Sequence, residues 1–296
     1  MVDAMVLFLN QFINGLGIGA IYALIALGYT MVYGIVKLIN FAHGDIMMVG
    51  AYSAVILMVD LSVSFPVALV VSMLVCVVIG VVIERVAYKP LRESPRICPL
   101  ITAIGVSYLL ENSAQLLFSA NPRPFPTVLS IPPIVIGGVN ISFITLLTVV
   151  VSVLLMIALQ YFVMTSRTGK AMRAVSEDMG AARLMGINVN ITISLTFAVG
   201  CALAAIGAML YCIAYPSVAP TMGMMPGLKA FIAAVLGGIG LIPGAMIGGF
   251  IMGIAESLTK GFVSSQLSDA VVYGILIIVL LFKPSGLLGK AQREKV

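Results

Sequence analysis

The sequence predicts an all-α, polytopic membrane protein with one transmembrane domain over residues 1–296. Hydrophobic residues make up 61% of the 296 residues and charged residues only 9%, whereas a soluble domain is about half apolar and roughly a quarter charged. There is too little polar surface to cover a water-soluble globule. At ~20 residues per crossing, the chain has room for about eight transmembrane segments, within a range of seven to nine, some of them short or broken.

Charge and cysteine content exclude several classes of function. The net charge is +5, but the sixteen lysines and arginines form no single patch that could follow a phosphate backbone, so we expect no nucleic-acid partner. The four cysteines are scattered and include no CxxC pair, which predicts neither a disulfide framework nor a metal site. Gly169 and Lys170 lack the rest of a P-loop. We therefore expect no catalytic residue, metal or cofactor in this chain.

Apolar stretches separated by polar breaks predict the individual helices. In order they cover residues 6–33, 45–59, 65–86, 97–118, 141–164, 190–213, 227–241, 244–259 and 267–282. Between them, the loop at 119–140 contains five prolines and is expected to be a stiff surface loop without a central strand or helix.

Three of these runs, at 45–59, 227–241 and 244–259, are unusually short. A 15-residue helix reaches about 22 Å, which is less than the ~30 Å hydrocarbon core. Each run follows glycine, proline or polar residues, and short interrupted spans are typical of broken helices that line a transport path. The alternative is plain short spans in a thinned bilayer.

Basic residues predict the orientation, because lysine and arginine concentrate on the cytoplasmic side. The loops at 119–140 and 214–226 hold only Arg123 and are expected outside, which leaves the C-terminus cytoplasmic and the N-terminus outside. The three basic clusters that carry this prediction are Arg85, Lys89, Arg92 and Arg96; Arg167, Lys170, Arg173 and Arg183; and Lys283, Lys290, Arg293 and Lys295.

Polar residues at membrane depth are the candidates for a translocation path, because an ionisable side chain in a span is costly and marks function by default. Lys37 and Glu111 also lie in or beside spans. The alternative for residues 40–45 is a capped cytoplasmic turn. The alternatives for Lys229 and Glu256 are side chains that snorkel to the membrane interface or an interhelical pair that fixes packing. The path candidates are Asn40, His43, Gly44, Asp45, Lys229 and Glu256.

The loop at 165–189 predicts a short amphipathic helix outside the membrane. An apolar stripe at helical spacing needs a surface that covers it, either the bilayer interface or a groove on a partner protein. Gly186 stands where a residue without Cβ can take a positive φ and end the helix. The stripe consists of Met172, Val175, Met179, Ala182 and Met185, with Arg173, Glu177 and Arg183 lying away from it.

The same loop carries a resemblance to a known family. Residues 180–186, GAARLMG, resemble the EAAxxxG loop of ABC-importer permeases, with Gly180 in place of the leading acid and two other acids, Glu177 and Asp178, nearby. More specifically, the chain is similar to the permeases of high-affinity branched-chain amino acid importers. The matching stretches are YALIALGYTMVYGI (22–35), INFAHG (39–44), AARLMGIN (181–188), PGLKAFIAAVLGGIG (226–240), PGAMIGG (243–249) and PSGLLG (284–289).

This resemblance implies a multi-pass subunit of the bacterial inner membrane and a set of partners. These would be a second, homologous permease, two cytoplasmic ATP-binding subunits, and a periplasmic binding protein that delivers leucine, isoleucine or valine. The implied ATPase-coupling residues are Met172, Val175, Glu177, Met179, Gly180, Ala181, Ala182, Arg183, Met185 and Gly186.

Three alternatives stay open at the level of sequence. Related permeases carry urea and short amides. A stand-alone secondary carrier would use the 40–45 region and Glu256 as an ion site, although the docking-type loop argues against it. A non-transporting assembly subunit has the same composition.

Overall fold

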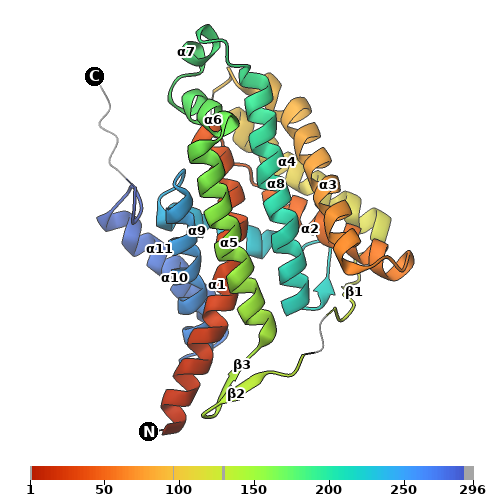
Figure 1. Cartoon of the computed structure of the whole chain (residues 1–296), viewed down its shortest axis with the longest axis vertical. Coiled ribbons are helices and arrows are strands. Elements are labelled where there is room, and N and C mark those ends of the chain that lie inside the picture. Colours follow the sequence, from red (N-terminus) through yellow and green to blue (C-terminus); the bar gives the residue numbers. More distant parts are fainter. Residues whose placement is uncertain (1, 96, 129–130, 290–296) are drawn as a thin grey trace.

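The computed structural model describes residues 2–95, 97–128 and 131–289, and it is mostly helical (Figure 1). Within that part of the chain, seven helical segments are long and apolar enough to cross a membrane, and α9 and α11 are shorter apolar helices. The all-α fold class and the expected range of segments are thereby confirmed. In order, the elements are α1 (Val2–Val36), α2 (His43–Val55), η1 (Ile56–Asp60), α3 (Phe65–Ile83), η2 (Glu84–Tyr88), η3 (Lys89–Leu91), α4 (Ile97–Phe118), β1 (Arg123–Pro124), β2 (Ile134–Ile136), β3 (Val139–Ile141), α5 (Phe143–Thr165), α6 (Arg167–Glu177), α7 (Met179–Leu184), α8 (Val189–Ala214), β4 (Ser217–Val218), α9 (Met224–Gly237), α10 (Ile242–Phe262) and α11 (Ser268–Phe282).

α1 is the central helix of the bundle. It is buried without interruption from residue 19 to residue 32, and it packs against α5, α8, α9 and α10. By contrast, α3, α4 and α5 lie at the periphery and expose valine, leucine and isoleucine side chains along most of their length. Lipid tails or another membrane subunit can cover such apolar surface, because a bilayer is as apolar as the side chains themselves.

Two helices, α2 and α9, begin in the interior of the bundle. After α1 the chain turns back through residues 37–42, and α2 begins with His43 beside Gly28 of α1. Gly28 lies eight residues before the end of α1, so this start is roughly 12 Å below that end at ~1.5 Å per residue. After α8 the chain returns through residues 215–223 to Met224, where α9 begins. The interruptions predicted before 45–59 and 227–241 are therefore present.

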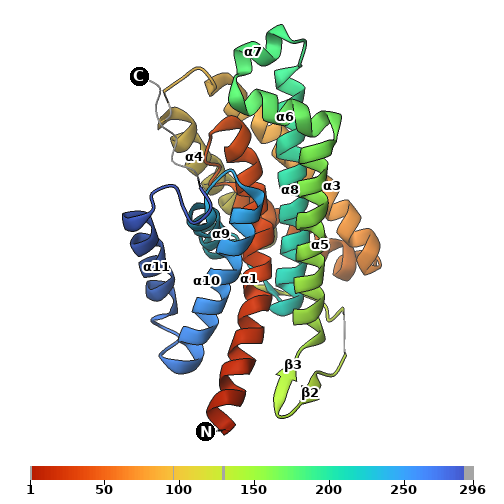
Figure 2. The ribbon, with the colours of Figure 1, turned by 60° about the vertical axis from the view of Figure 1, so that its left-hand side comes forward.

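The two halves of the chain follow one plan in opposite directions. The series α1, α2, α3, α4 matches α8, α9, α10, α11, and in each series a long helix precedes one that begins in the interior. Figure 2 shows the second of these short helices, α9, beside α1 and α10. The packing matches as well, because α3 packs on α8 as α10 packs on α1, and α2 packs on α8 as α9 packs on α1. Many membrane transporters are built from such inverted repeats, with their binding sites at the repeat interface.

The prediction of a third short run, at 244–259, is wrong. The structure has a full-length helix there, α10, which begins at Ile242 and ends at Phe262. Pro243 lies in the first turn, where proline fits because the N–H that it lacks has no helical partner at that position.

The proline-rich loop at 119–140 contains short strands that the sequence does not predict. β2 pairs antiparallel with β3 across Gly137 and Gly138, which both have positive φ, and β1 pairs with β4. Both ribbons have only two strands, and Pro124 in β1, the one proline within these four strands, lies at an edge, where a missing N–H interrupts no ladder.

The described residues of the three predicted basic clusters gather at one end of the bundle. α6 and α7 lie at this end, and the β2–β3 hairpin lies at the opposite end (Figure 1). The loop between α3 and α4 joins the α6–α7 end, since Arg92 donates a hydrogen bond to Asn190 at the start of α8 (2.7 Å). Residues 287 and 288 also lie there, bonded to the end of α9. Of the C-terminal basic cluster, Lys290, Arg293 and Lys295 fall outside the described residues, as does Arg96 of the first cluster.

We predict that the α6–α7 end faces the cytoplasm. In a variant without native cysteines, a membrane-impermeant maleimide applied to intact cells should label Val135→Cys in β2 and spare Glu93→Cys in the α3–α4 loop, both of which are exposed positions. Permeabilised cells should give labelling at both positions, which controls for reactivity. Labelling of Glu93→Cys in intact cells would contradict this orientation.

Candidate functional site

The interior starts of α2 and α9 meet at a crossing built from glycines. A Cβ atom placed on Gly44 would lie 2.4 Å from the carbonyl oxygen of Gly223, and one on Gly223 would lie 2.2 Å from the carbonyl oxygen of Gly44. Gly227, one turn into α9, approaches Gly44 almost as closely. Only glycine allows two backbones to come this near each other. The crossing therefore fixes both helix starts at the same depth in the bundle.

His43 and Asn40 lie beside this crossing, inside the protein. His43 is buried, its ring packs edge-on against Tyr29 of α1 (4.7 Å between centroids), and its Nε2 atom occupies space left free by Gly28. Asn40 accepts a hydrogen bond from the hydroxyl of Tyr88 (2.6 Å). Within the described residues, His43 Nε2 and Asn40 Nδ2 have no hydrogen-bond partner. The predicted polar group at 40–45 is thus a buried one and is not a capped surface turn.

Asp45, in the first turn of α2, faces a cavity of about 210 Å³. Its Oδ2 atom accepts a hydrogen bond from the hydroxyl of Ser107 in α4 (2.5 Å), whereas its Oδ1 atom has no partner in the described part of the chain. The cavity lies between α1, α2, α4 and the start of α9. Its lining consists of Tyr29, Phe41, Asp45, Ile104, Ser107, Tyr108, Glu111, Gly223, Met224, Gly227 and Leu228.

Of the six predicted path residues, Asp45 alone lines this cavity. Gly44 belongs to the crossing behind it, and His43 and Asn40 lie next to it. Glu111 has a sequence signal, since it is an ionisable residue within a span. Ser107 and Tyr29 carry no such signal, because hydroxyl side chains are common in packed helices. Across residues 2–95, 97–128 and 131–289, no group of three or more His, Cys, Asp or Glu side chains could hold a metal ion.

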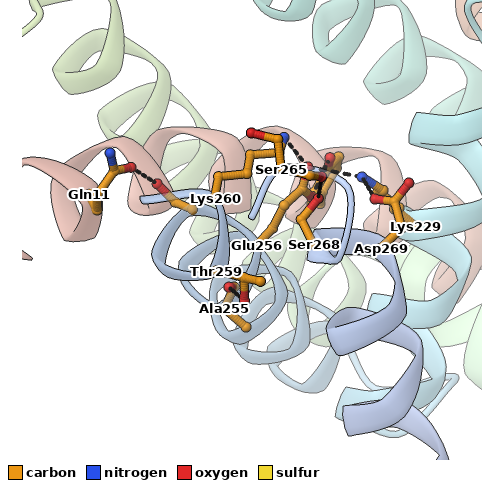
Figure 3. Close-up of polar contacts among 11 residues, drawn as sticks. Gln11, Lys229, Ala255, Glu256, Thr259, Lys260, Ser265, Ser268 and Asp269 are labelled. Atoms are coloured by element: carbon orange, nitrogen blue, oxygen red, sulfur yellow. Dashed lines mark hydrogen bonds and ion pairs between the residues drawn. The ribbon is translucent and has the colours of Figure 1, made fainter. Parts of the chain in front are cut away.

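Lys229 and Glu256 form an interhelical ion network away from the cavity. Glu256 Oε1 accepts hydrogen bonds from Lys229 Nζ (2.9 Å) and Lys260 Nζ (2.6 Å), and its Oε2 atom accepts one from the hydroxyl of Tyr22 (2.9 Å). Lys229 also pairs with Asp269 of α11 (2.7 Å, Figure 3). The network joins α1, α9, α10 and α11. The structure therefore favours the interhelical-pair interpretation of these two residues.

A second cavity, of about 470 Å³, lies at the α6–α7 end between α1 and the start of α4. It lies next to the first cavity. In α1, Tyr33 of its lining comes one helical turn after Tyr29, which lines the first cavity. In α4, Leu100 of its lining comes one turn before Ile104, which also lines the first cavity. Lys37 and Arg92 also line it. The two cavities thus follow the same pair of helices from one end of the bundle to its middle.

The predicted amphipathic helix at 165–189 is two helices, which corrects the expected continuous stripe. The chain takes an extended conformation at Asp178, whose carboxylate accepts hydrogen bonds from the backbone N–H groups of Gly180 (2.7 Å) and Ala181 (3.0 Å) and so begins α7. An N-cap of this kind competes with continuation of the preceding helix. Glu177 is the last residue of α6.

The stripe is also divided between buried and exposed residues. Met172, Val175 and Ala182 are buried against the chain itself, and Met179 is half-buried, whereas Met185 is 82% exposed and its neighbour Leu184 is 90% exposed. The intramolecular contact is made chiefly with α1, α5 and α8. Only the α7 end of the segment offers an apolar surface to a partner.

Gly186 ends α7 as predicted. Its φ is +81°, its N–H donates to the carbonyl of Arg183 (3.0 Å), and the N–H of Ile187 donates to the carbonyl of Ala182 (3.0 Å). These two bonds form a Schellman motif, in which glycine is preferred because a Cβ disfavours positive φ.

The inverted repeats, the interior helix starts and the cavity between them define a helical membrane transport protein, and this class is not an enzyme. The comparisons with known proteins give the family. Residues 11–280 match the family described as branched-chain amino acid transport system / permease component, and the chain belongs to it.

Full-length relatives agree with this assignment. The chain is 46% identical to the high-affinity branched-chain amino acid transport system permease protein BraD of Pseudomonas aeruginosa and 42% identical to the corresponding protein LivH of Escherichia coli, over 98% of each chain in both cases. It is 29% identical to a probable branched-chain amino acid transport permease protein LivH of Methanocaldococcus jannaschii, over 90% of this chain and 88% of that one. No solved structure matches the chain.

The ion network predicts a difference in stability between two of its members. Glu256→Ala should strongly lower the thermal stability of the detergent-solubilised protein, because removing one partner of a buried ion pair costs about 3–5 kcal/mol. Lys260→Ala is the matched control, because its side chain is 38% exposed and such pairs contribute only ~0–1 kcal/mol. Size-exclusion chromatography after heating measures both shifts. A shift for Glu256→Ala as small as that of the control would contradict a structural role.

Proposed function

We propose that this chain is one permease subunit of an ATP-driven importer of leucine, isoleucine and valine in the bacterial inner membrane. Its partners would be a second, homologous permease, two cytoplasmic ATP-binding subunits and a periplasmic binding protein. Family membership and the names of the full-length relatives support the substrate class and the kind of assembly. The observation that carries the transport role is the cavity at the meeting point of two interior helix starts.

The proposed path follows α1 and α4. From the α6–α7 end, the larger cavity leads along these helices to the smaller one at Asp45. Gly44, His43 and Asn40 hold α2 in position beside the path, and Lys229 and Glu256 hold α9 against α10 and α11. Non-helical backbone, such as that before the starts of α2 and α9, is tolerated at membrane depth only where protein or a water-filled cavity surrounds it. The position of the proposed path beside these two helix starts agrees with this requirement.

The secondary-carrier alternative has less support. Glu256, its proposed ion ligand, already accepts hydrogen bonds from two lysines and a tyrosine, so it has no free charge to bind a cation. The names of the relatives favour branched-chain amino acids over urea or short amides. Uptake of labelled leucine by proteoliposomes that contain the assembled importer, with and without ATP, tests the proposed function. Uptake that is independent of ATP would favour a carrier.

The path makes a prediction for the glycine crossing. Gly44→Leu should reduce leucine uptake by at least about tenfold with the protein still present in the membrane, because its Cβ would meet the backbone of Gly223 and force the two helix starts apart. Gly274→Leu in α11 is the matched control, since a Cβ there meets nothing within 4 Å. Unchanged uptake by Gly44→Leu would show that the crossing is a packing contact only.

We also propose that α7 couples ATP hydrolysis in the partner subunits to transport through the path. Leu184 and Met185 would contact an ATP-binding subunit, and Gly186 would set the direction in which the chain leaves α7 for α8. The other residues of the segment (Met172, Val175, Glu177, Met179, Gly180, Ala181, Ala182 and Arg183) would position α7 against the bundle or surround the contact.

This proposal predicts a specific uncoupled phenotype. Gly186→Val should insert normally, yet the ATP-binding subunits should no longer co-purify, or substrate should no longer stimulate ATP hydrolysis, because valine disfavours the φ of +81°. Gly137→Val, at a glycine with φ +59° in the hairpin at the opposite end, is the matched control. Arg183→Glu should have a smaller effect, since an exposed charge contributes ~0–1 kcal/mol. Wild-type co-purification and stimulation in Gly186→Val would contradict the coupling role.

A further inference from the structure

We infer that the cavity between α2, α4 and α9 binds a zwitterionic α-amino acid in a defined orientation. The ammonium group lies at Asp45 and Glu111, and the carboxylate lies at the start of α9. This inference rests on the proposed transport function and adds the recognition chemistry of its path.

The acidic side of the cavity lacks a cation. Asp45 is 2% exposed and its Oδ1 atom has no partner, while Glu111, one turn beyond Ser107 on α4, is 8% exposed and forms no ion pair with any residue that the structure describes. No lysine or arginine occurs in the lining. Two buried carboxylates without a basic partner favour a ligand that carries a positive charge and hydrogen-bond donors, and an ammonium group has both.

The start of α9 provides the opposite charge. Its N-cap is Gly223, no side chain among the described residues caps it, and no acidic residue lies in its first turn. The N–H of Met224 donates to the carbonyl of Thr221 (3.2 Å) and Pro226 has no N–H, which leaves the N–H groups of Gly223 and Met225 for a ligand. The start of α2 differs, because Asp45 already lies in its first turn. The N-terminal end of a helix carries roughly half a positive charge and binds carboxylates through free N–H groups. Gly223, Met224 and Gly227 bring this end of α9 to the cavity wall.

The remaining wall is apolar and suits an aliphatic side chain. Phe41, Ile104 and Leu228 line it. The volume of about 210 Å³ is below the ~300–1,000 Å³ of pockets for drug-sized ligands, so the cavity suits one small molecule. Carboxylate side chains, a helix start and apolar side chains around one cavity match a branched-chain amino acid better than a simple cation or a simple anion.

The test uses direct binding to the assembled importer, purified with its partner subunits, in the absence of the binding protein. Leucine is compared with isocaproate, which lacks the amino group, in the wild type, Asp45→Asn and Glu111→Gln. Either substitution should weaken leucine binding by at least about tenfold, equivalent to ~1.4 kcal/mol, and should leave isocaproate binding unchanged or improved. Glu93→Gln, in the exposed α3–α4 loop, is the matched control and should change neither.

The carboxylate end has its own variant. Met224→Asp places a negative charge in the first turn of α9, at the cavity wall. It should weaken leucine binding and spare isoamylamine, which lacks the carboxylate. The two ends are thus tested by different residues and different ligands, so that a folding defect in one variant leaves the other informative.

The outcomes separate this inference from the proposed function. Equal losses for leucine and isocaproate in both acidic variants, or no saturable leucine binding by the wild type at millimolar concentration, would overturn the orientation while ATP-dependent leucine uptake could remain. An importer that takes up no branched-chain amino acid would overturn the proposed function itself.

Discussion

The structure depends on satisfying backbone polar groups where two helices begin inside a membrane. Unpaired N–H and C=O groups cost several kcal/mol each in hydrocarbon, so a helix start at that depth must be enclosed by protein or by water. Here α2 and α9 enclose each other's first turns, and α1 and α8 cover them from either side. The peripheral helices α3, α4 and α5 contain no such interruption within the described chain and can face lipid along most of their length.

Glycine makes this enclosure possible, and the inverted repeat places it. The approach between Gly44 and Gly223 is reciprocal, and so is the approach between Gly28 and Gly200 where α1 crosses α8. A reciprocal contact is what two equivalent elements make across a pseudo-two-fold axis. The cavity beside Asp45 therefore lies at the interface of the two repeats, which is the place where one half of such a protein can move relative to the other.

The sequence predicts what composition and local pattern determine, and it misses what tertiary contacts determine. The spans, the interruptions before α2 and α9, and the helix end at Gly186 follow from hydropathy and from glycine chemistry. The extent of α10 is missed, because Pro243 at a first turn looks like an interruption although it starts a helix. The break at Asp178 is missed because the apolar spacing continues across it. Ser107 and Tyr29 become site residues only when α1, α2 and α4 come together.

Two groups of buried charge in this chain differ in how fully they are paired, and the difference separates structure from function. Glu256 accepts hydrogen bonds from two lysines and a tyrosine, so its charge is satisfied by the fold and holds four helices together. Asp45 accepts a hydrogen bond from one hydroxyl group, and Glu111 pairs with no cation among the described residues. Because a buried and unpaired carboxylate opposes folding, an apolar side chain at either position would give a more stable bundle. The unpaired carboxylates carry an unfavourable free energy of desolvation. A ligand that supplies a positive charge and hydrogen-bond donors removes this penalty, and its binding is stronger for that reason.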